Sequence, residues 1–259
     1  MKVSKFSFRN LIRIMLFGMF LIGIILYKSP NYVDLRLANA KPFMIEGHIF
    51  GCDRLGRDNW ALFSYGIFST LFLCLPARIL TLVFAAFFAF LGYMQNGRFR
   101  FLTDVISSVF LALPSLLVAL VVIAVLPPTQ LAIMIAIVFS DWAMSYETLQ
   151  GKLTELRRSP FIFASQSLGA SSIHLFYFHF IPALKSILEF LFITGIPSVI
   201  MTIALFSYLG IDTDIFQLGP GLGEQISFSK DYFDKTPVSV LLPILGIIGL
   251  VYSFGRDEK

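Results

Sequence analysis

Long apolar runs separated by short polar segments constrain this chain more than any other feature of its sequence. Hydrophobic residues make up 57% of the 259 residues, whereas charged residues make up only 14%. A water-soluble domain of this size does not carry such runs, and several of them reach the length of a membrane-spanning helix. We therefore expect an all-α polytopic membrane protein with about six transmembrane helices, at residues 11–27, 69–93, 105–126, 131–146, 186–206 and 238–254.

The apolar residues 14–27 of the first run follow four basic residues, a pattern that is also typical of a cleaved signal peptide. The triplet at residues 38–40 resembles a small-residue cleavage site, but it lies far beyond the run and behind two charged residues. We therefore interpret residues 11–27 as a retained first span, at the short end of the usual length.

The distribution of basic residues predicts which side of the membrane each polar segment occupies. If the N-terminus is cytoplasmic, twelve of the 20 Lys and Arg residues fall in cytoplasmic segments and seven in outward-facing ones. Because basic residues favour the cytoplasmic side, both termini and residues 147–185 are predicted to be cytoplasmic, with residues 28–68 and 212–237 outward-facing. The remaining basic residue is Arg78, which lies inside the second run. We expect it to snorkel to the interface or, alternatively, to take part in a translocation pathway.

The polar stretch between the fourth and fifth runs, residues 159–182, shows a helical pattern of its own. Gly169 can supply a left-handed helix stop, and Ser171 or Ser172 can cap a second helix. Pro182 is expected to mark a boundary just before the fifth run. The stretch is therefore predicted to form a short helix, a glycine turn and a second helix. One face of the first helix carries four residues at the i, i+3, i+4 and i+7 spacing: Phe161, Ala164, Ser165 and Leu168.

Neither a catalytic constellation nor a metal site is visible in the sequence. The three histidines, His48, His174 and His179, do not stand at a metal-ligand spacing from a carboxylate or cysteine. The two cysteines have the wrong number and spacing for a zinc site. The sequence has no phosphate-binding loop, so energy from nucleotide hydrolysis would have to come from another subunit. The chain is therefore predicted not to be an enzyme and to hold no cofactor or metal.

Charged residues are scarce within the runs, and basic residues are scattered over the chain. Scattered basic residues argue against nucleic-acid binding. A carrier driven by an ion gradient normally keeps ionisable residues within its spans. Asp141 is the candidate for a functional buried carboxylate, and an ordinary polar residue that faces the bundle interior is an equal alternative.

Five short motifs occur in the same order as in a known family of transport proteins. They are Gly51-Cys-Asp-Arg-Leu-Gly-Arg-Asp58 with Tyr65-Gly66, Asp104 with Leu113-Pro114-Ser115, the pattern within residues 161–182, Phe206-Ser-Tyr-Leu-Gly210, and Gly255-Arg256-Asp257. Over about four fifths of its length, residues 50–257, the chain resembles the inner-membrane permease subunits of binding-protein-dependent ABC importers, in the dipeptide/oligopeptide/nickel group. Each motif alone is weak, but five in the right order are specific.

The resemblance implies the transmembrane permease subunit of an ATP-driven importer, with a peptide as the default solute and nickel or another small solute left open. It also implies a bacterial cytoplasmic (inner) membrane location, an N-terminal span with an outward-facing segment at residues 1–68, and a permease core at residues 69–257. The implied partners are a second homologous permease subunit, two ATP-binding subunits that use the ATP, an extracytoplasmic substrate-binding protein and membrane lipid.

The resemblance also implies roles for individual residues. A cytoplasmic coupling helix between the fourth and fifth spans would contact the ATPases through Phe161, Phe163, Ala164, Ser165, Leu168, Gly169, His179, Ile181 and Pro182. An outward-facing segment, either a support for the binding protein or a structural ion-pair cluster, contains Asp53, Arg54, Gly56, Arg57 and Asp58. We place two further residues on the translocation path, Pro114 and Asp141.

Several departures from the family pattern keep other functions open. Phe163 stands where the coupling motif usually has a glutamate, and Ser165 replaces its second alanine. Glu147 and Gln150 stand where the family usually has arginines, and Cys52 replaces a threonine. Possible ion pairs with the ATPases are thereby lost, although apolar packing could still hold the joint. A stand-alone secondary transporter and a degenerate permease that acts as a membrane scaffold are the alternatives.

Overall fold

The structure, a computed structural model, describes residues 8–26, 29–94, 98–127, 129–211 and 219–255. Within these residues the chain folds into helices, and bridged extended backbone is limited to an isolated β-bridge between Cys52 and Asp58. The predicted all-α class is therefore confirmed. The last motif residues, Arg256 and Asp257, lie outside the described part of the chain.

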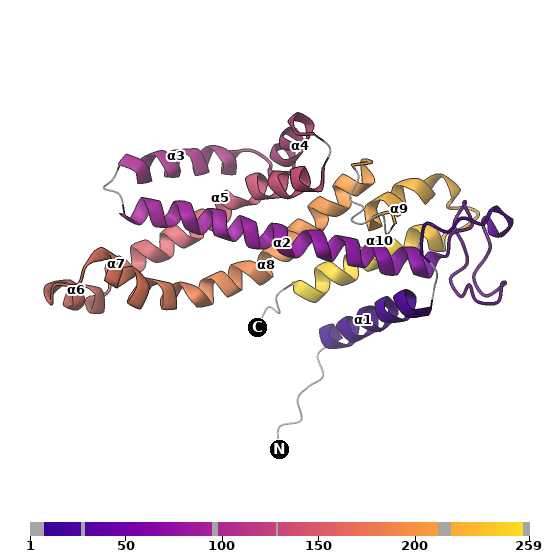
Figure 1. Ribbon diagram of the computed structural model, residues 1–259, viewed down its shortest axis with the longest axis horizontal. Helices are drawn as coiled ribbons and strands as arrows, with labels where there is room; N and C mark the ends of the chain where they lie inside the picture. The colour runs from indigo at the N-terminus through magenta and orange to yellow at the C-terminus, as the bar shows by residue number, and fades with distance from the viewer. Residues whose placement is uncertain (1–7, 27–28, 95–97, 128, 212–218, 256–259) are drawn as a thin grey trace, which may run out of the picture. The chain divides into compact units, whose positions relative to one another are not determined.

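Each of the six apolar runs coincides with a helix or a pair of helices (Figure 1). These are α1 (Phe8–Leu26), α2 (Asn59–Met94), α3 (Arg98–Ala112) with α4 (Ser115–Val125), α5 (Gln130–Arg157), α8 (Ile181–Tyr208) and α10 (Val238–Phe254). Shorter elements lie between them: the 3-10 helix η1 (Leu35–Leu37), α6 (Pro160–Ser167), α7 (Ser172–Leu175), the π-helix η2 (Phe176–Phe180), α9 (Leu222–Ser229) and the 3-10 helix η3 (Lys230–Tyr232).

Three helical stretches are long and apolar enough to cross a membrane: Asn59–Gly92, Gln130–Arg157 and Ile173–Tyr208. A fourth crossing results if the bent pair α3 and α4 is counted as one span. The apolar helix α10 is shorter, with 17 residues, and α1 has 19 residues. A polytopic membrane protein is therefore confirmed, whereas the number of six spans stays a prediction.

The third predicted span is wrong in its shape. The sequence predicts one span over residues 105–126, but α3 and α4 are bent by 100° at the break that follows Ala112. Pro114 explains the break, because its ring fixes φ and it disfavours helical backbone at the preceding Leu113. The same proline is the N-cap residue of α4.

Pro182 does not mark a helix boundary, contrary to the expectation. The helical stretch Ile173–Tyr208 runs through it, and Pro182 is the second residue of α8. Because proline has no N–H, it cannot donate to the carbonyl of Phe178, four residues earlier. The backbone widens instead into η2, where the Ile181 N–H donates to the Phe176 carbonyl five residues earlier.

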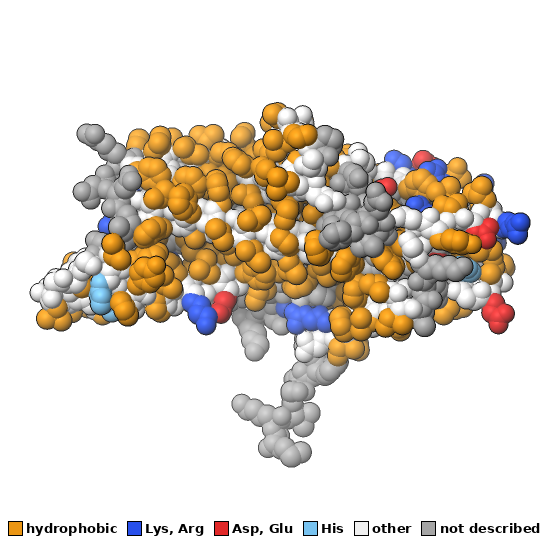
Figure 2. Space-filling view, viewed as in Figure 1, with side chains coloured by type: hydrophobic (Ala, Val, Ile, Leu, Met, Phe, Trp, Pro, Cys, Tyr) orange, Lys and Arg blue, Asp and Glu red, His pale blue; other side chains and the backbone are white. Residues whose placement is uncertain are grey.

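The chain divides into two compact units, and α2, α5 and α8 each contribute residues to both. Unit 1 comprises Met1–Leu75, Pro128–Ile133 and Ile196–Lys259, and unit 2 comprises Pro76–Pro127 and Met134–Gly195. The resemblance implies another division, into an N-terminal part at residues 1–68 and a permease core at residues 69–257. That division differs from these two units and stays a prediction. Hydrophobic side chains cover much of the visible face in Figure 2, as a lipid-facing surface requires.

Each unit has its own packing. In unit 1, α1 lies against α10, where the Arg13 guanidinium donates to the carbonyl oxygen of Ser253 at 2.9 Å. In unit 2, a buried apolar cluster joins side chains of α2, α5 and α8 with those of the stretch at 159–182. Trp142 and Tyr146 are among its largest members. This cluster positions the candidate site.

Candidate functional site

The stretch at residues 159–182, here called the elbow, folds around a glycine turn. Pro160 begins α6 at the position where a missing N–H costs least. Gly169 has a φ of +85°, and its N–H donates to the Gln166 carbonyl at 2.9 Å. The next N–H, of Ala170, donates to the Ser165 carbonyl at 3.1 Å. These two bonds form a Schellman motif, so the predicted glycine stop is confirmed.

The second helix of the elbow begins as the sequence predicts. The Ser171 hydroxyl oxygen accepts a hydrogen bond from the His174 N–H at 3.2 Å, which identifies Ser171 as the capping side chain. This helix, α7, continues without a break through η2 into α8. The elbow is therefore a side helix followed by the end of a membrane-length helix.

One apolar residue of α6 that sequence reasoning missed fastens the side helix to unit 2. Ile162 is 1% exposed and belongs to the same buried cluster as Leu175 and Phe180 of the second helix. The face predicted from helical spacing is not buried, since Leu168 at its end is 89% exposed. An eight-residue helix with one buried side chain has too little periodicity for the sequence to indicate which face is inside.

Three of the predicted coupling residues meet within the elbow. His179 Nε2 lies 3.1 Å from the hydroxyl oxygen of Ser165, and the Phe161 ring centroid lies 5.8 Å from that of the imidazole. Ile181 lines an apolar cavity of about 160 Å³ beside Phe90. The contact between Ser165 and His179 joins α6 to η2 and so links the two arms of the elbow.

Large apolar side chains project from the elbow. We call this set the elbow surface; its members are Phe161, Phe163, Leu168, Ile173, Tyr177 and Phe178. Beside them lies an open hollow of about 500 Å³, lined by residues that include Gly169, Ala170 and His174. No ionised side chain belongs to the elbow surface, so its chemistry suits an apolar partner surface.

Arg78 does not snorkel, which corrects the first expectation for this residue. It is 2% exposed and forms an ion pair with Asp141, and its guanidinium also donates to the Leu191 carbonyl. A side chain at Gly195 would overlap with the guanidinium. Because Gly195 has no Cβ, α8 leaves room for the guanidinium of the ion pair. The other predicted path residue, Pro114, lies at the bend between α3 and α4.

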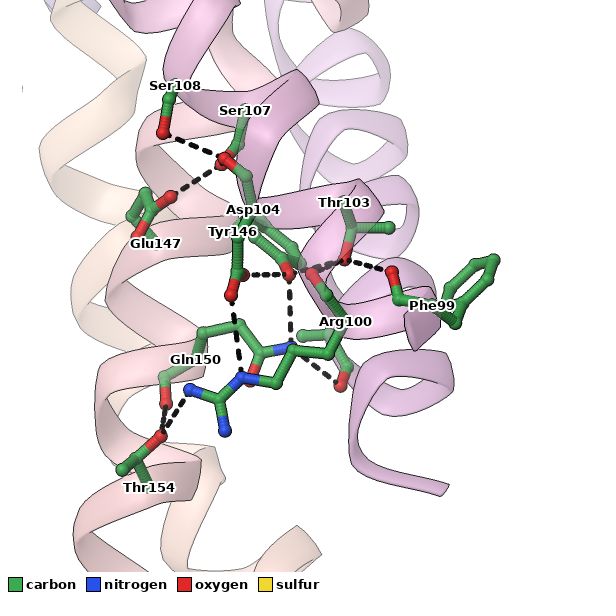
Figure 3. A network of polar contacts seen from close by, with 11 residues as sticks. Phe99, Arg100, Thr103, Asp104, Ser107, Ser108, Tyr146, Glu147, Gln150 and Thr154 are labelled. Carbon is green, nitrogen blue, oxygen red and sulfur yellow. Dashed lines mark hydrogen bonds and ion pairs between the residues drawn. The ribbon is translucent and has the colours of Figure 1, made fainter. Parts of the chain in front are cut away.

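A polar network in unit 2 holds α3 against α5 (Figure 3). The Tyr146 hydroxyl donates to the Asp104 carboxylate at 2.7 Å and lies 2.7 Å from the Thr103 hydroxyl. Ser107 donates to the Glu147 carboxylate, and the Gln150 amide donates to the Tyr146 hydroxyl at 3.3 Å. Glu147 and Gln150 therefore point into helix packing. The expectation that their lack of positive charge removes ion pairs with the ATPases stays a prediction.

The predicted outward-facing segment is an internally paired loop in unit 1. Asp53 is buried, accepts from the N–H groups of Leu55 and Arg57 at 2.9 Å, and pairs with the Arg57 guanidinium at 2.7 Å. The Arg54 guanidinium carbon lies 3.4 Å from the centroid of the Phe228 ring in α9. These contacts fasten the loop to its own unit.

Three potential metal ligands meet in the same loop, which corrects the expectation that no histidine pairs with a carboxylate and a cysteine. Ligand atoms of His48, Cys52 and Asp58 all lie within 4.8 Å of one another. Burial, with smaller effects of Asp58 and Asp53, raises the pKa of the Cys52 thiol to about 12. Burial also raises the pKa of Asp58, against hydrogen bonds from Ala61 and His48 that lower it.

Comparison with known proteins gives a consistent set of relatives. The oligopeptide transport system permease protein OppC of Bacillus subtilis (strain 168) is 30% identical over 209 residues, which cover 80% of this chain and 68% of that protein. The dipeptide transport system permease protein DppC of Alkalihalophilus pseudofirmus is 26% identical over 257 residues, 98% of this chain and 83% of that protein. The glutathione transport system permease protein GsiD of Escherichia coli (strain UTI89) is 27% identical over 236 residues, 88% of this chain and 74% of that protein.

A family model also matches the chain, over residues 79–256. The matched region holds the elbow and the bend between α3 and α4. Because it covers more than half of the chain, the resemblance expected from the five motifs is confirmed. The chain is therefore a membrane permease and not an enzyme. It belongs to the family of binding-protein-dependent transport system inner membrane components.

Proposed function

We propose that this chain is the transmembrane permease subunit of an ATP-driven importer and that it moves solute by alternating access. Its similarity to permease proteins of oligopeptide and dipeptide transport systems supports a peptide as the solute. ATP is hydrolysed by partner subunits, because the sequence has no phosphate-binding loop of its own. The partners proposed are a second homologous permease subunit, two ATP-binding subunits and an extracytoplasmic substrate-binding protein.

The orientation proposed is that of the bacterial inner membrane with both termini cytoplasmic. The excess of Lys and Arg in the segments that would face the cytoplasm supports it. In this orientation the elbow is cytoplasmic, and the paired loop that contains Asp53 and Arg57 faces outward. The binding protein would then meet a loop whose charged side chains are already paired with one another.

The elbow surface is the observation that carries the proposal. Its apolar side chains stand on a base that Ile162 and Phe180 fix in the core of unit 2. A close-packed core transmits a displacement rather than absorbing it. Docking of an apolar helix into a groove on an ATP-binding subunit would therefore move the helices that bear the elbow when nucleotide binding closes that subunit.

One substitution tests this docking. Leu168→Ser removes an exposed leucine side chain from the elbow surface, and burial of such a side chain is worth about 1.5–3 kcal/mol. We expect the affinity for the ATP-binding subunits to fall by roughly 10- to 100-fold. Solute-stimulated ATP hydrolysis by the reconstituted importer should fall with it.

Val125→Ser is the matched control, because Val125 is also a highly exposed apolar residue of unit 2 but lies at the end of α4, outside the elbow. It should leave ATP hydrolysis unchanged. Equal stimulation of both variants would contradict the docking role. Solute uptake by the purified chain alone, driven by an ion gradient, would support a secondary transporter instead.

A further inference from the structure

The loop that precedes α2 brings an imidazole, a thiol and a carboxylate together although they are spread over eleven residues of sequence. His48 Nδ1 lies 2.8 Å from Asp58 Oδ2, and a β-bridge pairs Cys52 with Asp58. We propose that His48, Cys52 and Asp58 form a binding site for a divalent transition-metal ion, with Zn²⁺ as the preferred occupant.

The backbone holds the three residues in place without help from a ligand. The Cys52 N–H donates to the Ala40 carbonyl at 3.0 Å, and a turn joins His48 to Gly51 through an N–H to carbonyl bond of 2.9 Å. Asp53 closes the turn that follows, by accepting from two backbone N–H groups and from the Arg57 guanidinium. The ligands are thus preorganised by neighbours that are themselves satisfied, as metal sites require.

The Asp58 carboxylate can serve the ion and the helix at the same time. Its Oδ1 accepts from the Ala61 N–H at 2.8 Å and so caps α2, whereas Oδ2 faces His48. Metal coordination through Oδ2 leaves the cap intact. An ion at this position would therefore tie the loop to the first turn of a membrane-length helix.

The donor set selects the class of ion. One nitrogen, one thiolate and one carboxylate suit zinc and its neighbours, whereas Mg²⁺ and Ca²⁺ prefer oxygen ligands alone. Three protein ligands leave a fourth tetrahedral position for water or an incoming group. On coordination the Cys52 thiol gives up its proton to solvent and binds as thiolate.

The fit requires adjustments in two directions: His48 and Asp58 have to separate slightly, and the wider of the ligand-atom separations, which reach up to 4.8 Å, have to shorten. Ligand atoms of a tetrahedral zinc site lie roughly 3.3 Å apart, given bond lengths of about 2.0–2.3 Å. His48 and Asp58 therefore have to separate by about half an ångström from their present hydrogen bond, which the His48 side chain can supply because it is 26% exposed. Cys52 is fully buried, so the ion would have to enter past His48, the most exposed of the three residues.

The test is metal binding by the full-length chain, purified in detergent with a non-histidine affinity tag under reducing conditions. We expect one Zn²⁺ per chain by elemental analysis after gel filtration. Co²⁺ should bind at the same site and give a near-ultraviolet band from thiolate-to-cobalt charge transfer. This band reports coordination by a cysteine and does not depend on transport activity, so it is independent of the proposed function.

Matched variants assign the site. Cys52→Ser should abolish the band, and Cys52→Ser and His48→Gln should each weaken Zn²⁺ binding by at least about 100-fold, because even outer partners of a metal ligand are worth roughly 10- to 100-fold. Cys74→Ala and His174→Gln, which change the other cysteine and a histidine of α7, should bind as the unmodified chain does. Absence of stoichiometric binding by the monodisperse unmodified protein would overturn the proposal. A band that survives Cys52→Ser would overturn it as well.

Discussion

The charges of Arg78 and Asp141 neutralise each other inside unit 2, although the two residues are 63 positions apart in the sequence. Neither the pairing nor the role of Gly195 could be predicted from the sequence, because each depends on which helices become neighbours. The sequence indicates only that ionisable residues inside a span are costly and need partners. On that ground the sequence identifies Asp141 as a candidate, and its place on the translocation path stays a prediction. Arg78 is expected at the interface because arginines near span ends usually snorkel, and this expectation is wrong.

Loss of one partner should destabilise unit 2 more than loss of both. Asp141→Asn leaves the Arg78 guanidinium buried without a counter-charge and should lower the free energy of unfolding by about 3 kcal/mol. The double variant Arg78→Met/Asp141→Leu removes both charges and should be closer to the unmodified protein. Unfolding in detergent, followed by the fluorescence of the two tryptophans, measures both. A double variant less stable than Asp141→Asn would contradict a purely compensating pair.

Gly169 permits a second prediction at this scale. A Cβ there meets no atom within 4 Å, so only the φ of +85° opposes a side chain. Gly169→Ala should therefore cost about 1–2 kcal/mol of backbone strain at the turn and reduce coupled ATP hydrolysis, with the amount of protein in the membrane unchanged. Gly151→Ala is the control, since Gly151 is equally open but lies within α5. Identical activity of the two variants would show that the turn geometry does not matter.

Among the elements, the long helices were predictable, whereas their interruptions and the short helix α9 in a segment expected to be a polar loop were not. The apolar runs place every long helix, because membrane length and apolar composition are read directly from sequence. Pro114 and Pro182 have the same chemistry but different outcomes: the first separates two helices by 100°, and the second leaves a π-helix inside a continuous one. Packing around each proline decides between these outcomes, and a single sequence does not contain it.

The link between the two arms of the elbow gives a prediction at the element scale. Ser165→Ala removes the hydroxyl that meets His179 and should weaken the attachment of α6 to η2, which the burial of Ile162 still maintains. Hydrogen–deuterium exchange of residues 160–170 should then become faster, because the local opening free energy falls by about 1 kcal/mol.

Ser167→Ala is the control on the same helix, because the Ser167 hydroxyl donates to the Phe163 carbonyl within α6. Exchange in this variant should match that of the unmodified protein. Equal exchange in both serine variants would show that Ser165 does not hold the elbow together.

For the whole molecule, the class and family could be inferred from sequence, while the sites that depend on long-range contact could not. The glycine turn was predictable because Gly169 acts through local backbone geometry. Ile162 was missed because its burial depends on α6 folding back onto unit 2. The grouping of His48, Cys52 and Asp58 was missed because a closed loop, and not a regular spacing, brings them together.

The transport mechanism proposed for the whole molecule requires that the elbow touches an ATP-binding subunit. Leu168→Cys provides the most direct measurement, because Leu168 is highly exposed and both native cysteines are buried. In the assembled importer, a short thiol-reactive cross-linker should join this position to an ATP-binding subunit, and labelling by a membrane-impermeant reagent should require opened cells. Labelling of Leu168→Cys in intact cells, or cross-linking only to an extracytoplasmic partner, would contradict the proposed coupling.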